Sequence, residues 1–435
     1  MKYRSTLHRS PEVSLRDAVL CGSAPDGGLY LPVAMPHLSA KFLEQLPSLS
    51  FQEIAQEVAG LFVGDEIPEA TLRAIIADAF DFPVPLVPLS ERLHILELFH
   101  GPTLAFKDFG ARFMARLMGF FVAETGHELT VIVATSGDTG SAVAQAFLGV
   151  PGIRVIILYP AGRVSAAQEK QLTTLGQNIT ALEVSGSFDD CQRLAKQALV
   201  DPDVTGRITL TSANSINIAR LIPQSFYYFS AVAQLKTPDA LPVFAVPSGN
   251  FGNLTGGLLA KRLGLNVGQF IAATNTNDVV PEFLRSGKLI PRASRHTISN
   301  AMDVGNPSNF ARIVDLYDND LQAIRRDIMG CSFSDEETLR VMHDVEQRHG
   351  YLLDPHAAVG VLGWECYAKQ NPPVTQGIVL ATAHPSKFAD TVARATGVRP
   401  EMPERLAAFL DRPKKSIPFP NRFADLQEFL LAANS

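Results

Sequence analysis

The stretch PVFAVPSGNFGNLTGGLLAKRLG, residues 242–264, joins an apolar run, a glycine-rich turn and a helix-forming segment. The run PVFAVP at 242–247 has the length of a buried strand, and SGNFGN at 248–253 ends it with turn residues. A strand that leads through a glycine turn into a helix is the repeating unit of a parallel sheet. This stretch therefore predicts an α/β fold.

Other apolar runs repeat this unit along the chain. They are LTVIVAT at 129–135, RVIILYP at 154–160, ITALEV at 179–184, FIAATN at 270–275 and GIVLATAH at 377–384. Strands that alternate with helices form largely parallel sheets with both faces covered. We therefore expect two open, largely parallel-sheet α/β lobes.

Proline-rich segments divide the chain into parts. FPVPLVPL at 82–89 follows a turn-rich opening with its own helical stretches, and a second proline-broken segment occupies 399–423. We expect three parts. They are a small N-terminal domain at 1–92, a core of two α/β lobes at 93–395 whose smaller lobe spans roughly 110–225, and a C-terminal extension at 396–435.

The composition excludes several classes of protein. The chain has 435 residues and a formal net charge of -6, so it lacks the basic surface that would bind nucleic acid or an anionic membrane. No apolar run is long enough for a membrane span, and the first residues do not resemble a signal peptide. The four cysteines are widely separated and form no CxxC pair, so we expect neither a metal site nor a disulfide framework. A cytoplasmic protein is the expectation.

Lys107 lies among apolar residues in ELFHGPTLAFKDFG, residues 97–110, where a helix is expected to begin. Two interpretations compete. Its stem can lie along apolar surface while the amino group reaches water, which is common near helix starts. Alternatively, desolvation between Phe106 and Phe109 lowers its pKa and makes the neutral amine available as a nucleophile or base.

Three polar turns can hold anions. SGNFGN at 248–253 precedes a helix whose free N–H groups can bind a phosphate, although an ordinary turn has the same residues. It is neither a P-loop nor a dinucleotide fingerprint, which argues against a nicotinamide dehydrogenase. TSGDTG at 135–140 offers hydroxyls that can cap a helix or hold an anion. TSANSINIAR at 211–220 adds Arg220 as a charged donor for a second anion.

A desolvated lysine together with a phosphate-binding turn, without a metal motif, fits pyridoxal 5'-phosphate. The amine of Lys107 would condense with the aldehyde of this cofactor as a Schiff base, while a helix N-terminus holds its phosphate.

On these motifs the sequence resembles the threonine synthase family, in the branch with an N-terminal extension. The family has the tryptophan-synthase-β-like fold of pyridoxal phosphate enzymes, fold type II. The matching motifs are DGGLYLP, LFHGPTLAFKDFG, ATSGDTG, SANSINIAR, VPSGNFGN, SNAMDVGNPSN and ATAHPSKF, and they span nearly the whole chain.

The resemblance implies a role for each matching residue. Lys107 forms the Schiff base, and Thr382 faces the pyridine nitrogen of the cofactor. The cofactor phosphate is held by Gly249, Asn250, Phe251, Gly252 and Asn253. Asn214, Ser215 and Arg220 are implied to contact the phosphate of the substrate. Ser136 and Thr139 are implied to lie beside the substrate and the cofactor. Asp138 stands where wider relatives have an asparagine that contacts the cofactor's 3'-oxygen, and since a carboxylate cannot donate that hydrogen bond, its role stays open.

The resemblance also implies the reaction, in which O-phospho-L-homoserine and water become L-threonine and phosphate in amino-acid biosynthesis. One alternative is a serine or threonine dehydratase of the same fold, and Arg220 argues against it because such substrates carry no phosphate. Another is a catalytically silent homologue that binds a phosphorylated ligand. For His356 we expect a structural role, with Asp354 as N-cap. His100 and His384 are placed near the site by the motifs, without a catalytic task, and the oligomeric state stays open, a monomer included.

Overall fold

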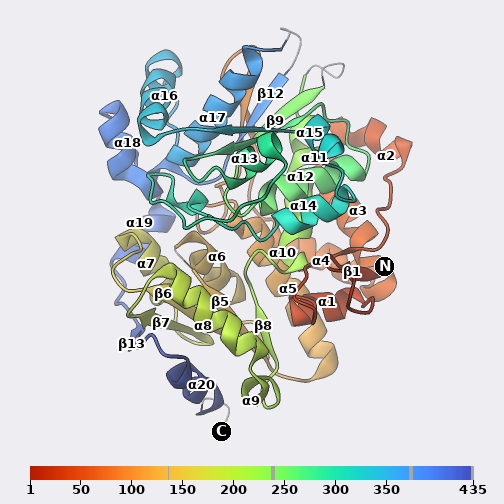
Figure 1. Cartoon of the computed structure of the whole chain (residues 1–435), viewed down its shortest axis with the longest axis vertical. Coiled ribbons are helices and arrows are strands. Elements are labelled where there is room, and N and C mark those ends of the chain that lie inside the picture. Colours follow the sequence, from red (N-terminus) through yellow and green to blue (C-terminus); the bar gives the residue numbers. More distant parts are fainter. Residues whose placement is uncertain (136, 237–240, 372–375, 433–435) are drawn as a thin grey trace.

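The computed structural model describes residues 1–135, 137–236, 241–371 and 376–432. Within these ranges the chain forms two α/β lobes, each built around one large sheet, and a small two-stranded sheet near the N-terminus. The larger lobe lies at the top of Figure 1 and the smaller lobe at the bottom. The expected fold class is confirmed.

The sheet of the larger lobe has six strands in the described ranges. In order across the sheet they are β11 (Ile328–Ser332), β10 (Phe270–Thr274), β9 (Pro242–Pro247), β12 (Gln376–Ala381), β4 (Leu93–Glu97) and β3 (Leu86–Pro88). All neighbours are parallel except β3 and β4. Along β9, Val243 and Ala245 face one apolar cluster while Phe244 and Val246 face another. Both faces of the strand are thus buried, which explains its continuous apolar run.

Helices cover both faces of this sheet. They are α11 (Phe226–Ala233), α12 (Gly252–Arg262), α13 (Val279–Ser286), α14 (Phe310–Leu316), α15 (Leu321–Asp327), α16 (Asp335–His349), α17 (Pro355–Ala368) and α18 (Ala389–Thr396). Helix α17 packs on β9, β10 and β12. It begins as expected, because the Asp354 side chain accepts hydrogen bonds from two N–H groups of its first turn and Pro355 is its first residue.

The smaller lobe has a five-stranded parallel sheet in the described ranges. Its strands are β13 (Ser416–Phe419), β7 (Ile179–Val184), β6 (Ile153–Pro160), β5 (Leu129–Ala134) and β8 (Leu210–Ser212). The helices around it are α5 (Lys107–Thr125), α6 (Asp138–Phe147), α7 (Ala166–Thr173), α8 (Phe188–Val200), α9 (Pro202–Thr205) and α10 (Ile218–Leu221). Helices α6 and α8 pack against β6.

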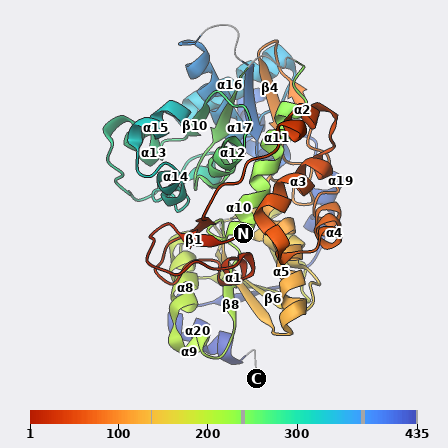
Figure 2. The same cartoon turned by 90° about the vertical axis from the view of Figure 1, so that its right-hand side faces the viewer.

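The N-terminal segment lies against both lobes (Figure 2). It contains β1 (Tyr3–Ser5), α1 (Leu15–Cys21), β2 (Tyr30–Pro32), α2 (Ala40–Gln45), α3 (Phe51–Val63) and α4 (Glu69–Ala79). Helix α3 starts with a capping box formed by Ser50 and Glu53. It packs on α11 of the larger lobe, while α4 packs on α5 of the smaller lobe. This segment therefore contacts both lobes.

The C-terminal segment returns to the smaller lobe. After α19 (Glu404–Leu410), strand β13 adds to the sheet beside β7, and α20 (Phe423–Ala432) packs on α8. The expected extension thus completes a sheet whose other strands lie more than two hundred residues earlier in the chain. The domain boundaries at 92 and 395 stay predictions.

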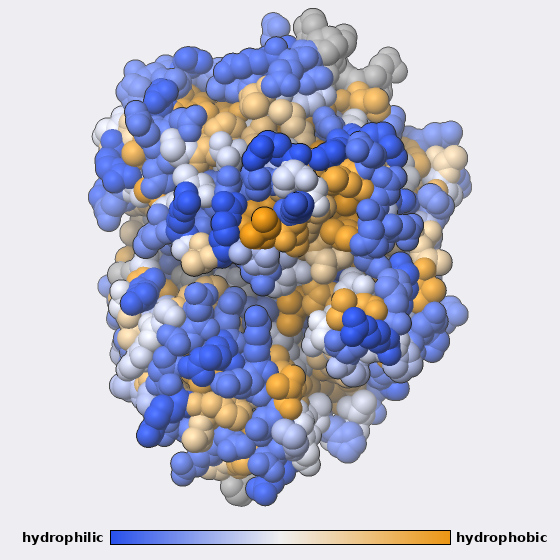
Figure 3. Space-filling model, viewed as in Figure 1, coloured by the Kyte–Doolittle hydropathy of each residue, from blue (hydrophilic) through white to orange (hydrophobic). Residues whose placement is uncertain are grey.

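The surface is mainly hydrophilic on the face in Figure 3, and hydrophobic side chains gather near its middle, where the lobes meet. Within the described residues, no helix has both the length and the apolar composition needed to cross a membrane.

Candidate active site

Lys107 is the first residue of α5 and lies beside the chain that leaves β12. The N–H of Phe106 donates to the carbonyl of Thr382 at 2.9 Å, and Ala105 forms an isolated antiparallel bridge with Ala383. These contacts join two sequence motifs at the carboxyl end of the larger sheet. In open α/β sheets this is the edge where ligands bind.

The amino group of Lys107 is available for chemistry. Its Nζ lies 5.1 Å from the ring centroid of Phe106, and it has no hydrogen-bond acceptor among the described residues. Burial lowers the pKa of Lys107. The carboxylate of Asp138 opposes burial, whereas the charges of Lys387 and Arg220 lower the pKa further. These observations favour the interpretation of Lys107 as a desolvated, reactive amine over the one in which its amino group reaches water.

Phe109, expected on the other side of Lys107, is part of an aromatic cluster. Its ring centroid lies 5.1 Å from that of Phe82 and 5.2 Å from that of Tyr227, in edge-on contacts. Phe109 is fully buried and anchors α5, so Phe106 is the ring that lies against the lysine.

Asp138 forms an ion pair with Lys387 at 2.7 Å, and neither side chain has appreciable exposure. The amide of Gln168 also donates to the same carboxylate oxygen, at 2.9 Å. Burial alone would raise the pKa of Asp138, but the charges of Lys387 and Lys107 hold it below its ordinary value. Asp138 is thus an ionised counter-ion, which gives a physical account of the carboxylate at this position.

Lys387 was not singled out from the sequence, although it belongs to the motif ATAHPSKF. Its Nζ also donates to the carbonyl of Thr103 at 2.8 Å. The N–H and hydroxyl of Thr103 in turn donate to Asp108, at 2.9 and 2.7 Å. Burial raises the pKa of Asp108 to about 6 against these hydrogen bonds. This network fixes the loop that leads into Lys107.

The turn SGNFGN leads from β9 into α12, and Phe251 adopts a left-handed φ of 62°. A Cβ on Gly249 would lie 2.7 Å from Cα of Met302, so packing alone requires glycine there. A Cβ on Gly252 would lie 3.4 Å from its nearest neighbour, Nδ2 of Asn309, which is an ordinary contact. Packing against the protein therefore does not by itself require glycine at 252, whereas close approach of a ligand to the N–H groups of α12 would.

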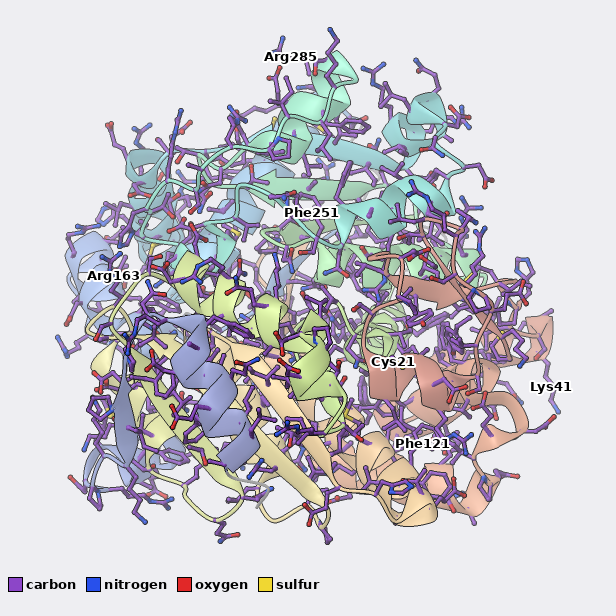
Figure 4. The ribbon with its side chains drawn as sticks, turned by 60° about the horizontal axis from the view of Figure 1, so that its bottom comes forward. Cys21, Lys41, Phe121, Arg163, Phe251 and Arg285 are labelled. Carbon is purple, nitrogen blue, oxygen red and sulfur yellow. The ribbon has the colours of Figure 1, made fainter. Side chains whose placement is uncertain are left out.

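Asn253 continues this turn with an unused donor. Its Oδ1 accepts hydrogen bonds from the hydroxyls of Tyr227 and Tyr228, at 2.7 and 2.8 Å. Its buried Nδ2 has no partner among the described residues. Figure 4 labels the neighbouring Phe251 near the middle of the molecule, between the lobes.

The polar loop 211–220 lies against this turn. The amide of Asn250 donates to the hydroxyl oxygen of Ser215 at 2.5 Å, so the cofactor turn and the loop expected to bind substrate form one polar surface. Asn214 donates to the carbonyl of Ala134 at 2.9 Å, and both Asn214 and Ser215 are half-buried.

Arg220 is almost fully buried, with 4% of its surface exposed. One end of its guanidinium donates to the carbonyl of Ala213 at 2.6 Å, while its Nε has no partner among the described residues. Burial lowers the pKa of Arg220 to about 10, and the charge of Asp108 opposes this. An anionic ligand would supply the missing partner.

The remaining expected residues have different outcomes. Thr139 is half-buried in the first turn of α6, and Thr382 is buried with its hydroxyl unused by any described hydrogen bond. Ser136 lies outside the described residues. Asn309, the last residue of the motif SNAMDVGNPSN, and Arg312, three residues beyond it, contact Ser215 and were not singled out from the sequence.

The histidines have structural contacts. His356 shares a hydrogen with Asp354 at 2.7 Å and accepts from the N–H of Ala301 at its other nitrogen, as expected for a structural group. His100 pairs with Glu97 at 2.7 Å. His384 bonds the hydroxyl of Ser386 at 2.8 Å, and burial lowers its pKa.

These features together fit pyridoxal 5'-phosphate. A lysine with a lowered pKa is available for the aldehyde, Thr382 lies in the segment bonded to Phe106 beside it, and Gly252 begins α12, whose first N–H groups can bind a phosphate.

Comparison with known proteins agrees with the site. The family model described as pyridoxal-phosphate dependent enzyme matches residues 82–414, and the model of the threonine synthase N terminus matches residues 2–80. The chain is 42% identical to threonine synthase of Escherichia coli (strain K12), over 99% of both chains. It is 44% identical to threonine synthase of Haemophilus influenzae, over 98% of both.

Solved structures extend the agreement to three dimensions. The crystal structure of threonine synthase from Escherichia coli matches with a TM-score of 0.93, 42% identity and full coverage of both chains. The pyridoxal phosphate-bound threonine synthase from Brucella melitensis matches with a TM-score of 0.94 and 38% identity, over 100% of this chain and 99% of that one. A threonine deaminase from Solanum lycopersicum, 16% identical with a TM-score of 0.59, shares the fold alone. The chain therefore belongs to the threonine synthase family of pyridoxal-phosphate-dependent lyases.

Proposed function

We propose that this site converts O-phospho-L-homoserine and water into L-threonine and phosphate. The observation that carries the proposal is the buried guanidinium of Arg220, which lacks a partner at Nε and lies close enough to Lys107 to lower its pKa. A substrate with an amine at one end and a phosphate at the other suits a site with these two groups.

Bound pyridoxal 5'-phosphate would supply the electron sink that stabilises negative charge on the substrate carbons. Lys107 would then carry protons between neighbouring carbons of the substrate. Its lowered pKa favours the neutral amine, the form that can accept a proton at one carbon and return it at the next. One amine held beside the substrate could serve these neighbouring carbons in turn.

Arg220 would hold the departing phosphate together with Asn214 and Ser215. Ser136 and Thr139 would lie beside the rest of the substrate. A charged donor stabilises the negative charge that grows on the phosphate as its bond to carbon breaks. Thr382 would offer a neutral hydroxyl to the pyridine nitrogen. A neutral group holds a proton on that nitrogen less firmly than a carboxylate does, so negative charge is directed along the substrate chain.

A selective variant tests the proposal. Arg220→Ala should lower kcat/KM for O-phospho-L-homoserine roughly 30-fold to 1000-fold, because it removes a charge-assisted contact of about 2 to 4 kcal/mol from a buried site. Cofactor binding, and binding of amino acids without a phosphate, should stay close to wild type. Arg116→Ala is a matched control, since Arg116 pairs with Asp78 on the outer side of α5.

Equal loss for both classes of ligand would contradict the role of Arg220. Wild-type protein that releases ammonia from L-threonine or L-serine, yet no phosphate from O-phospho-L-homoserine, would favour the dehydratase alternative. We further infer that the protein acts in the cytoplasm, where its small-molecule substrate would be found.

A further inference from the structure

Two cysteines outside the active-site motifs meet in the larger lobe. Cys331 lies on the edge strand β11, and Cys366 lies in the last turn of α17. The thiol of Cys331 donates a hydrogen bond to Sγ of Cys366 at 3.4 Å, although the two residues are 35 positions apart. Both are free thiols, and no CxxC motif predicts their contact. The fold therefore assembles a pair of thiols from two separate elements.

The two thiols differ in their access to solvent. Cys331 is buried, with 8% of its surface exposed, and it packs in the apolar cluster between α17 and the sheet. Cys366 is half-buried and lines a surface groove of about 350 Å³ between α16 and α17. A small reagent in this groove reaches Cys366 first, and Cys331 lies behind it.

The surroundings of the two sulfurs assign them different roles. Burial raises the pKa of Cys331 to about 12, and its hydrogen bond to Cys366 and a negative charge on Cys366 raise it in the same direction. Cys331 therefore keeps its proton, which leaves the outer sulfur, Cys366, as the nucleophile. Conversion of Cys366 into an uncharged group would remove the charge repulsion and ease the loss of the proton from Cys331.

Charged side chains in the groove favour one kind of oxidant. More acidic than basic groups line the groove, namely Glu337, Asp344 and Glu365 against Arg340 and Lys369. A small uncharged oxidant meets no electrostatic barrier there, whereas an anionic one such as glutathione disulfide is repelled. Hydrogen peroxide is the oxidant class that fits.

We propose that Cys366 and Cys331 form a site of reversible oxidation by hydrogen peroxide, in which Cys366 reacts first and Cys331 then closes a disulfide. In the first step the sulfur of Cys366 attacks the peroxide. An S–O bond forms, the O–O bond breaks, and the leaving hydroxide takes up the proton of the Cys366 thiol as water.

The second step joins the two residues. The sulfur of Cys331 attacks the sulfenic acid on Cys366, an S–S bond forms and the S–O bond breaks. The leaving hydroxide takes up the proton of Cys331 as a second water. The two thiols thus lose two hydrogens in total, and the peroxide is reduced to two waters.

The disulfide would have two consequences for the protein. The sulfurs are already in contact, so the bond requires an approach of about 1.4 Å. It would tie the edge strand β11 to α17, which also packs on β9, β10 and β12. It would also keep Cys366 recoverable, since thiol reductants reverse a disulfide but not a sulfinic acid.

Peptide mapping of the wild-type holoenzyme tests the proposal directly. The folded protein is treated with hydrogen peroxide, the remaining thiols are alkylated without reduction, and the peptides are analysed by mass spectrometry. We expect one crosslinked pair of peptides, joined through Cys331 and Cys366 and lighter by two hydrogens, which a thiol reductant separates. Cys21 is the control within the same chain, because it is exposed but has no sulfur neighbour among the described residues. Oxidation of Cys21 while Cys331 and Cys366 remain free thiols would overturn the proposal.

Two single variants test the order of the steps. In Cys331→Ser the oxidised Cys366 has no thiol to close on, so it should accumulate as the sulfenic acid that dimedone captures and proceed to sulfinic acid. In Cys366→Ser the buried Cys331 should remain a free thiol at the same peroxide concentration. Capture of Cys331 by dimedone in this variant, as fast as that of Cys366 in Cys331→Ser, would contradict the assigned order.

Thermal unfolding separates a crosslink of the native fold from one formed after unfolding. A disulfide that closes a loop of 35 residues should raise the unfolding temperature of the oxidised holoenzyme by roughly 3 to 8 °C. The shift should disappear with a thiol reductant and be absent in Cys366→Ser. An unchanged or lower unfolding temperature, or a disulfide that forms only in urea, would overturn the proposal. None of these measurements uses turnover, so their outcome is independent of the proposed function.

Discussion

Two polar regions of the active site differ in whether their buried positive charges have anionic partners. Around Lys107, the cation of Lys387 has a carboxylate partner, Asp138, at 2.7 Å. Around Ser215, the cation of Arg312 has only neutral acceptors, and that of Arg220 keeps an unused donor. The first region is balanced by the protein itself, whereas the second lacks a negative charge.

The difference indicates what each region does. A free neighbouring cation would lower the pKa of a lysine, and a free neighbouring carboxylate would raise it. A lysine that must act as a neutral amine therefore needs neighbouring charges that are already paired with each other. A region that binds phosphate gains most if its cations are unpaired before the ligand arrives. On the proposed function, reaction and anion binding are divided between two sets of residues.

The largest effect is expected at the amine itself. Lys107→Ala should lower turnover roughly 1000-fold or more, because the proton carrier is lost. The phosphate region stays intact in this variant, so pyridoxal 5'-phosphate should still bind, though without a covalent bond. Absorbance and equilibrium dialysis measure both effects, and complete loss of cofactor binding would show that the two regions are not separable.

Breaking the ion pair between Lys387 and Asp138 should destabilise the fold. Lys387→Met leaves Asp138 buried and unpaired, which should lower the free energy of unfolding by about 3 to 5 kcal/mol. Adding Asp138→Asn removes the orphaned charge and should restore part of that loss. Urea denaturation of both single variants and the double variant measures this, and additive losses would contradict the pairing.

Two glycines of the turn SGNFGN test the second region, around Ser215. Gly252→Ala should fold normally but weaken binding of pyridoxal 5'-phosphate about 10-fold to 100-fold, since its Cβ takes up space left for the ligand. Gly249→Ala is the matched comparison and should instead destabilise the fold, because its Cβ meets Met302 at 2.7 Å. If Gly252→Ala kept full affinity, the phosphate would have to lie elsewhere.

A smaller effect is expected at Asp108, next to the reactive lysine. Its pKa is raised to about 6 in the folded protein, so the folded state holds this proton more tightly than the unfolded state does. Its contribution to stability is therefore greatest below about pH 4 and is lost as the pH rises through 6. Between pH 4 and 7, wild type should lose on the order of 2 to 3 kcal/mol relative to Asp108→Asn. If the difference in free energy of unfolding between the two proteins stayed constant from about pH 4 to 7, the raised pKa of Asp108 would be contradicted.

The sequence predicted much of the fold because its strands are long and buried on both faces. The bounds of β7 and β9 coincide with the apolar runs ITALEV and PVFAVP. The three-residue strand β8 and the edge strand β13 escaped notice, since β8 is short and β13 contains a proline among mostly exposed residues. Their place in the sheet is decided by tertiary pairing rather than by local pattern.

The site was predicted where its residues form contiguous motifs, as around Lys107 and SGNFGN. Lys387 and Asn309 lie in quoted motifs and Arg312 follows one, but none was singled out because their roles arise from contacts between distant segments, such as the bond from Lys387 to Thr103. The direction of an amide or hydroxyl hydrogen, such as those that meet at Ser215, depends on such partners and has no sequence signal.

The central claim is that, of the two lysines in this site, Lys107 is the free amine and Lys387 is paired with Asp138. Borohydride reduction of the holoenzyme, followed by proteolysis and mass spectrometry, would fix the cofactor to the lysine that bears it. We predict the pyridoxyl label on Lys107 and an unmodified Lys387. A label on Lys387 would contradict the account.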